Sequence, residues 1–121
     1  MMEQVIKTIR QTLETIHTDV YFKRAGKNTQ NPYIVFTIAS NGSEDPNRDD
    51  NILSINVWGD DYSNPSVYFL ADAIEETLKM KRILNDNHFL SFSKISRLGI
   101  PDPDPLTERI ELRFNIRTYK R

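Results

Sequence analysis

Apolar residues recur along the chain with two different spacings. Over residues 2–17 they return every three or four positions, which places them on one face of an α-helix. A second run with this spacing begins at Asn64-Pro65, a pair typical of a helix start because Asn caps a helix and Pro fits its first position. The pattern predicts two helices, the second ending near the basic residues of 79–82.

Other segments alternate between apolar and polar residues, which is the spacing of a β-strand. Five strands are expected, at residues 19–24, 32–39, 52–59, 88–98 and 107–119. The alternation slips near Ser93, which indicates a β-bulge. Short links between strands favour antiparallel pairing. Helices that are apolar on one face only favour a fold of two layers, in which the helices pack on a sheet. The sequence therefore predicts an α+β fold in the order α-β-β-β-α-β-β. Its sheet, antiparallel or mixed, has about five strands and carries both helices on one face.

Two connections differ in composition from the rest of the chain. Residues 40–51 are strongly polar, so we expect a mobile loop there. Its acidic residues are Glu44, Asp45, Asp49 and Asp50. Residues 99–106 hold three prolines, which stiffen the connection and prevent sheet pairing. The last strand would run ~40 Å, against a diameter of ~35 Å for a compact domain of this size. Either it spans the whole body, or the hairpin at 99–106 projects as an arm that docks on a neighbour.

Composition narrows the classes of protein that fit. The chain has 121 residues, which suits one domain over 1–121, and a net charge of −1 gives no general attraction for nucleic acid or an anionic membrane. With no cysteine, disulfides and zinc–thiolate sites are excluded and an intracellular origin is favoured. The start lacks the pattern of a signal peptide, and no apolar run approaches the ~20 residues of a membrane span.

A calcium site is the first chemistry to consider. Asp45, Asn47 and Asp49 have the spacing of the first three ligands in a calcium loop. However, Asp50 stands where that loop needs Gly, and Asn56 stands where it needs Glu. A solvated acidic loop is therefore favoured, and no metal or cofactor is expected.

Acid–base catalysis has little support in the sequence. His17 and His88 lie far apart and outside known nucleophile or metal motifs, so we expect them at the surface or at element boundaries. Asp102 and Asp104 sit between prolines, where Asp is a common turn residue. We therefore predict that the protein has no catalytic residues and is not an enzyme.

The last predicted strand has one polar face. Its residues include Arg109, Glu111, Arg113, Arg117 and Tyr119. Arginines at every fourth position, ~13 Å apart, would suit a phosphate track. Because an acidic residue interrupts them and the chain is neutral, a solvated or subunit-facing surface with cross-strand ion pairs is favoured.

Trp58 and Tyr62 flank the turn before the second helix. Trp58 lies opposite the apolar face of its strand, where it either caps the edge of the core or anchors an interface. The candidate subunit interface therefore comprises both aromatic residues and the polar face of the last strand.

Several strings, in this order, resemble the tail-completion and tail-terminator proteins of long-tailed bacteriophages and prophages. The strings are Asn31-Pro32-Tyr33-Ile34-Val35-Phe36, Leu53-Ser54-Ile55-Asn56-Val57-Trp58, Leu70-Ala71-Asp72-Ala73-Ile74 and Glu111-Leu112-Arg113-Phe114. Each string mostly encodes one face of a strand or helix, and the likeness lies in their combination across almost the whole chain.

The resemblance implies a structural virion protein without catalytic residues. Such proteins assemble as a ring, commonly hexameric, at the head-proximal end of the tail tube, after a period in the host cytoplasm. The ring ends tube polymerisation, meets the tail-tube and head-connector proteins, and lets DNA pass without sequence readout. The acidic loop would then face the lumen. The alternative is a small adaptor or regulatory module that binds a protein or nucleic acid.

Overall fold

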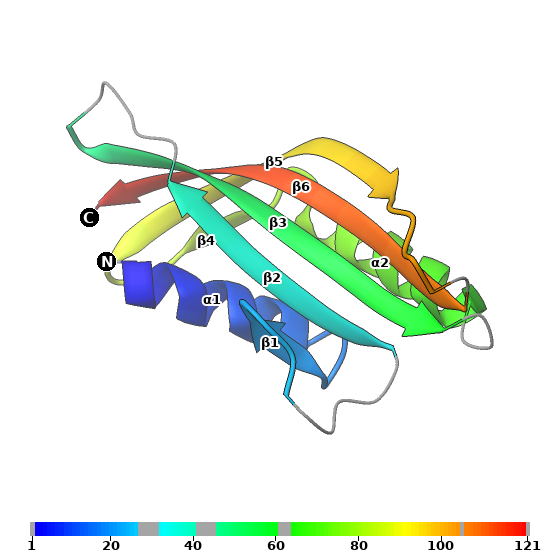
Figure 1. The fold of residues 1–121 in the computed structure, drawn as a ribbon. Coiled ribbons are helices and arrows are strands. Elements are labelled where there is room, and N and C mark those ends of the chain that lie inside the picture. Colours follow the sequence, from blue (N-terminus) through cyan, green and yellow to red (C-terminus); the bar gives the residue numbers. More distant parts are fainter. Residues whose placement is uncertain (1, 27–31, 41–45, 61–63, 105, 121) are drawn as a thin grey trace.

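The computed structural model describes residues 2–26, 32–40, 46–60, 64–104 and 106–120. Within these ranges the chain forms two helices and six strands (Figure 1). The helices are α1 (Met2–Glu14) and α2 (Asn64–Leu78). The strands are β1 (Val20–Phe22), β2 (Tyr33–Ser40), β3 (Arg48–Asp60), β4 (Arg82–Leu84), β5 (His88–Gly99) and β6 (Thr107–Lys120).

All six strands belong to one mixed sheet with the order β1-β2-β3-β6-β5-β4. β1 and β2 run parallel, and the other neighbouring pairs are antiparallel. The longest pairing joins β3 to β6, from Arg48 opposite Tyr119 to Asp60 opposite Thr107. The 14 residues of β6 extend over about 45 Å at roughly 3.3 Å per residue. These two strands therefore set the long axis of the sheet.

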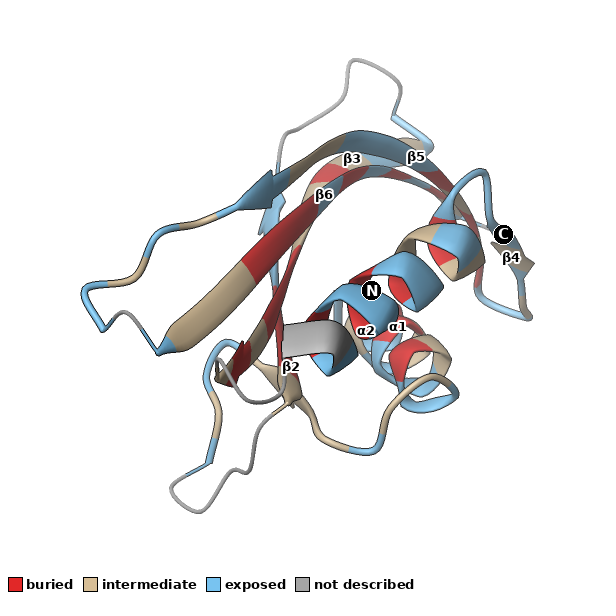
Figure 2. Ribbon diagram, turned by 90° about the vertical axis from the view of Figure 1, so that its right-hand side faces the viewer, coloured by how far each residue is buried: buried red, intermediate tan, exposed pale blue. Residues whose placement is uncertain are grey.

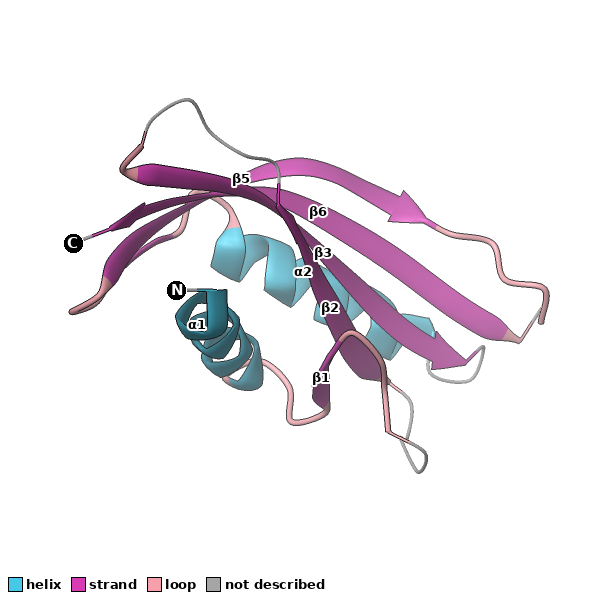
Figure 3. Cartoon of the chain, turned by 60° about the vertical axis from the view of Figure 1, so that its left-hand side comes forward, coloured by secondary structure: helices cyan, strands magenta, loops and turns pink. Residues whose placement is uncertain are grey.

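Both helices lie on the same face of the sheet, which curves over them (Figure 3). Buried positions concentrate between these two layers, as the colouring of Figure 2 shows. The helices contribute Val5, Ile9, Leu13, Val67, Ala71, Ile74 and Leu78 to the core. The central strands contribute Leu53, Ile55, Val57, Ile110, Leu112, Phe114 and Ile116. The predicted α+β fold with two helices is thus confirmed.

The predicted count of about five strands misses β4. Helix α2 ends at Leu78, and Met80 adopts a left-handed conformation with a φ of 57°, which reverses the chain. The carbonyl of Lys81 then accepts a 2.9 Å hydrogen bond from the amide of Phe92, and β4 pairs with β5. Arg82 therefore lies in a strand and not at a helix end. Three residues are too few to show an alternating pattern in the sequence.

The predicted loop at 40–51 is wrong at both of its ends. Ser40 belongs to β2, and residues 48–51 form the start of β3. Asp49 lies opposite Thr118 on β6, and Asp50 lies opposite Arg117. Because β6 offers backbone hydrogen bonds along its whole length, it holds even this polar segment as a strand.

The predicted bulge in β5 is present, as a shift of register between Lys94 and Ser96. On either side of it, Lys94 and Arg97 both reach the helix layer. Arg97 Nη1 lies 2.6 Å from Asp72 Oδ1 and 2.9 Å from Glu75 Oε2, and Lys94 forms an ion pair with Glu75. These pairs attach the edge of the sheet to α2, and they lower the pKa of Glu75.

Candidate functional site

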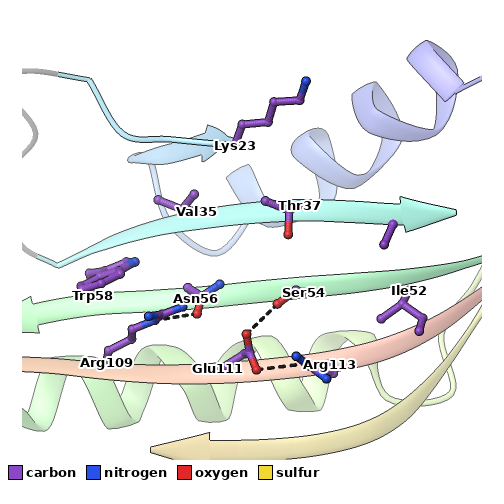
Figure 4. Close-up of a pocket in the computed structure, with 11 residues that line it drawn as sticks. Lys23, Val35, Thr37, Ile52, Ser54, Asn56, Trp58, Arg109, Glu111 and Arg113 are labelled. Carbon is purple, nitrogen blue, oxygen red and sulfur yellow. Dashed lines mark hydrogen bonds and ion pairs between the residues drawn. The ribbon is translucent and has the colours of Figure 1, made fainter. Parts of the chain in front are cut away.

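Polar and aromatic side chains gather on the face of the sheet opposite the helices, which we call the outer face. Side chains alternate along a strand, so the even-numbered residues of β3 and the odd-numbered residues of β6 share this face. A hollow of about 540 Å³ lies on it, between β2, β3 and β6 (Figure 4). Among the residues that line it are Trp58, Arg109, Glu111 and Arg113. The structure thus brings these four predicted interface residues together.

Trp58 is the centre of an ordered stack at one end of the outer face. Its ring lies nearly parallel to that of Tyr33, with centroids 6.3 Å apart and an angle of 10°. The guanidinium carbon of Arg109 lies 4.7 Å from the Trp58 ring centroid, and Arg109 Nε donates a 2.8 Å hydrogen bond to Asn56 Oδ1. Trp58 is therefore half-buried on the outer face, outside the cluster of core residues. Its role as an interface anchor stays a prediction.

Glu111 places a nearly buried carboxylate in the floor of the hollow, with a relative exposure of only 8%. Its Oε2 accepts a 2.9 Å hydrogen bond from Ser54 Oγ, and its Oε1 accepts a 3.1 Å bond from Arg113 Nε (Figure 4). Buried charges are tolerated when they are paired in this way. The ion pair of Glu111 is therefore with a neighbour on its own strand, β6. The side-chain contacts between β3 and β6 on this face, Ser54 to Glu111 and Arg109 to Asn56, are hydrogen bonds, so the predicted cross-strand ion pairs are not seen among these residues.

The hollow also contains residues that the sequence analysis did not single out. Lys23 overhangs it from the end of β1, and Ser54 and Asn56 rise from β3. The last two alternate with Leu53 and Ile55, so their common face was readable from the sequence. Their role depends on the pairing of β3 with β6, because Ser54 binds Glu111 and Asn56 binds Arg109.

Residues 100–104, which follow β5 and include Asp102 and Asp104, lie close to the end of the outer face where Trp58 and Tyr33 stack. Burial raises the pKa of Tyr33, and the negative charge of Asp102 raises it further. The amide of Ile100 donates a 2.9 Å hydrogen bond to the carbonyl of Arg109, which continues the ladder past the end of β5. This connection therefore begins as an extension of the sheet.

The far end of the outer face holds the remaining predicted interface residues. Arg117 and Tyr119 lie there on β6. At the rise per residue of a β-strand, Tyr119, the farther of the two, is about 33 Å from Arg109 along the strand. Asp50, opposite Arg117, is held by two contacts from Arg48, with Nε–Oδ1 at 3.0 Å and Nη2–Oδ2 at 3.1 Å. The charge of Asp50 is thus compensated on a strand, unlike that of a solvated loop carboxylate. Tyr62, Glu44 and Asp45 lie outside the described residues.

The two histidines have structural contacts. His17 is half-buried, and its Nε2 lies 2.8 Å from the carbonyl oxygen of Pro32. His88 lies at an element boundary, as predicted, but it is fully buried and not at the surface. It opens β5 with its side chain on the core face, and Asn85 Nδ2 lies 3.1 Å from its Nε2. Burial lowers the pKa of His88.

The calcium-loop spacing is not realised as a loop, because Asp49 and Asp50 both belong to β3. Within the described ranges, no group of three or more His, Cys, Asp or Glu side chains is placed to hold a metal ion. None of the helices in the same ranges is long and apolar enough to cross a membrane.

Comparison with known proteins gives one family and a set of similar folds. The family model described as "Tail completion protein gp17" matches residues 3–119. A search of the curated proteins found no match. A chain from the "virion of native gene transfer agent (GTA) particle" is similar, with a TM-score of 0.72 and 16% identity, over 92% of this chain and 91% of that chain. A second solved structure gives a TM-score of 0.66 and 10% identity, over 93% of this chain and 94% of that one.

The family match defines the class of protein: a structural component of a phage tail, in a family that is not one of enzymes. The chain belongs to the tail completion protein gp17 family. The resemblance seen in the sequence strings is thereby confirmed. As a tail completion protein, it assembles with other proteins of the phage tail.

Proposed function

We propose that this protein forms a ring at the head-proximal end of the tail tube, where it ends tube polymerisation and joins the tail to the head. The family match over residues 3–119 is the observation that carries the proposal. The ring is commonly hexameric in proteins of the kind that the sequence resembles. The chain waits in the host cytoplasm until a tube end is available.

The outer face suits one side of the contact between subunits. Tyr, Trp and Arg are enriched at protein interfaces, and Trp58, Tyr33 and Arg109 are stacked together on this face. Because these side chains are already held in place, little conformational entropy is lost when a neighbour covers them. Glu111, Arg113, Arg117 and Tyr119 extend the same surface, and Tyr62 is proposed to join it.

The tail-tube protein and the head-connector protein are the proposed partners at the two faces of the ring. DNA passes through the lumen without sequence readout, and no membrane is involved. Glu44 and Asp45 are proposed to face the lumen, where like charge keeps the DNA sliding. Asp49 is exposed and is proposed to contribute as well, whereas Asp50 contributes less because Arg48 compensates its charge.

Native mass by light scattering, over a concentration series with and without assembled tail tubes, tests the proposal. A particle whose mass is a ring-sized multiple of 14.1 kDa supports it, as do monomers that become bound at tube ends. A strict monomer that ignores tubes contradicts it and supports the adaptor alternative. An equal mass of an unrelated α+β protein, mixed with the same tubes, controls for adsorption.

Nucleic-acid binding is the second candidate, because Arg113 and Arg117 are exposed on the outer face. A fluorescent single-stranded oligonucleotide at low salt tests it, since phosphate contacts are strongest there. Binding that disappears when both arginines are replaced by Ala would favour this candidate. Absence of binding by the unaltered protein removes it.

A further inference from the structure

Two exposed arginines at the far end of the outer face form a second, separate hollow. Arg82 lies opposite Ser91, and Ser91 lies opposite Arg117, so the three residues stand side by side on β4, β5 and β6. Neighbouring strands are ~4.8 Å apart, which puts the two arginine Cα atoms roughly 10 Å from each other. Phe89 and Tyr119 complete this hollow of about 420 Å³, with ring centroids 6.0 Å apart. We call Arg82, Ser91 and Arg117 the arginine cradle.

The arginine cradle has positive charge without a matching acid. Within the part of the chain that the structure describes, no carboxylate forms an ion pair with Arg82 or Arg117. Asp50 is the acid opposite Arg117, and it is already held by Arg48. A guanidinium binds a carboxylate through two parallel hydrogen bonds, and an aromatic wall keeps water away from such a pair. The chemistry of the cradle therefore suits a carboxylate brought by a partner.

The opposite end of the same sheet carries carboxylates that are held ready in a stiff segment. In residues 100–104, Asp102 Oδ1 accepts a 2.9 Å hydrogen bond from the amide of Asp104. Asp104 accepts bonds from the amide of Leu106 at 3.0 Å and from Thr107 Oγ1 at 3.2 Å. Pro101 and Pro103 restrict the backbone further. We call residues 100–104 the acidic connection; its preset shape lowers the entropy lost on binding.

The acidic connection cannot reach the arginine cradle of its own chain. Thr107, which follows the connection, and Arg117 are ten residues apart on one continuous strand, which is about 33 Å along its length. The two complementary surfaces can therefore meet only between copies. A contact between two different patches of the same chain is heterologous, and a heterologous contact closes into a ring when its rotation permits.

We infer that the acidic connection of one copy docks in the arginine cradle of the next copy, with Asp102 and Asp104 as the carboxylates that Arg82 and Arg117 bind. This inference rests on the proposed ring and names one of its contacts. A nucleic-acid strand is the competing occupant. It fits less well, because Glu111 and the uncharged Asn115 interrupt the positive charge along β6, whereas a phosphate backbone needs a continuous track.

Charge reversal on each side tests the inference. The cradle variant carries Arg82→Glu and Arg117→Glu, and the connection variant carries Asp102→Lys and Asp104→Lys. Each alone is expected to need at least about tenfold more protein to form rings, because like charges then face each other. A 1:1 mixture is expected to form rings again, since the two variants can alternate and every contact regains opposite charges. Rings of the mixture would hold an even number of subunits.

The control is Lys7→Glu, a charge reversal at an exposed position on α1, which is expected to assemble like the unaltered protein. Circular dichroism checks that all variants are folded. If both charge-reversed variants assemble normally, or if the folded variants fail to assemble even when mixed, the inference is wrong while the proposed ring stands. Assembly is measured with and without tail tubes, and if the unaltered protein neither forms a ring nor binds tube ends, the proposed function itself fails. Oligonucleotide binding that only the cradle variant loses, with assembly intact, would assign the cradle to nucleic acid instead.

Discussion

Arg109 lies over the indole ring of Trp58, 4.7 Å from its centroid, while its Nε is bound to Asn56. Three adjacent strands meet in this arrangement, because Tyr33 stacks on the other side of the same ring. The stack is on the outer face, away from the core. Because we propose that this face contacts a neighbouring subunit, mutations on it and mutations in the core lead to distinct expectations.

Trp58→Ala is expected to lower the free energy of unfolding by about 1–2 kcal/mol, from the lost ring stack and the lost cation–π contact. Its effect on ring formation should be larger than its effect on stability. Urea denaturation and native mass measure the two. Phe69→Ala, which removes an exposed aromatic ring from the helix layer, is the control and should change neither strongly. A Trp58→Ala protein that assembles normally would contradict a role of Trp58 in the interface.

Glu111→Gln is expected to destabilise the fold by about 1 kcal/mol, because the charge-assisted hydrogen bonds from Ser54 and Arg113 are weakened. Thermal unfolding of the variant measures this. Glu108→Gln removes a half-buried acid three residues away that has no ion pair among the described residues, and should be nearly neutral. Equal unfolding temperatures for the two variants would show that the pairs of Glu111 add nothing.

Glu75→Gln should remove an acid-sensitive part of the stability. Lys94 and Arg97 lower the pKa of Glu75 below its usual value of 4.5. Near and below pH 4.5, the folded state therefore binds fewer protons than the unfolded state. The gain over the variant is therefore present above pH 4.5 and lost as the pH falls further. Because solvent screens these partly exposed pairs, the gain should be no more than about 1 kcal/mol. Urea denaturation of both proteins at neutral and acid pH measures it. Glu76→Gln is the control, since the Glu76 side chain is 77% exposed and 3.6 Å from Lys79.

His88 should add a second pH dependence of the same sign. Burial lowers its pKa below the usual 6.5, so below that pH the unfolded chain takes up a proton that the folded chain resists. Unfolding is therefore expected to become easier as the pH falls from 6.5. His88→Leu should flatten this slope, whereas His17→Gln keeps His88 and should keep it. An unchanged slope in the His88 variant would contradict the assignment.

The sequence pattern was sufficient for the two helices and for the longer strands. Residues 2–17 and 107–119 show this most clearly, because a long run repeats its spacing many times, and here the ends shifted by three residues at most. The bulge near Ser93 was visible for the same reason, as an interruption of a long alternation. The organisation as one domain stays a prediction.

Features that depend on partners distant in the sequence could not be predicted. β4 forms because Arg82–Leu84 pair with β5. Residues 48–51 form a strand because they pair with β6. His88 is buried because its side chain lies on the core face of β5 and contacts Asn85, although the three residues before it, 85–87, are polar. The arginine cradle was missed for a similar reason. Arg82 belongs to that surface only when β4 is known to be in the sheet.

The central claim is that this protein forms a ring at one end of the tail tube. Electron microscopy of tail tubes polymerised with and without it tests this most directly. With the protein present, tubes are expected to stop growing and to carry a ring of this protein at a single end, identified by a gold-labelled tag. Tubes that grow to the same lengths in both samples, with label along their sides or nowhere, would contradict it.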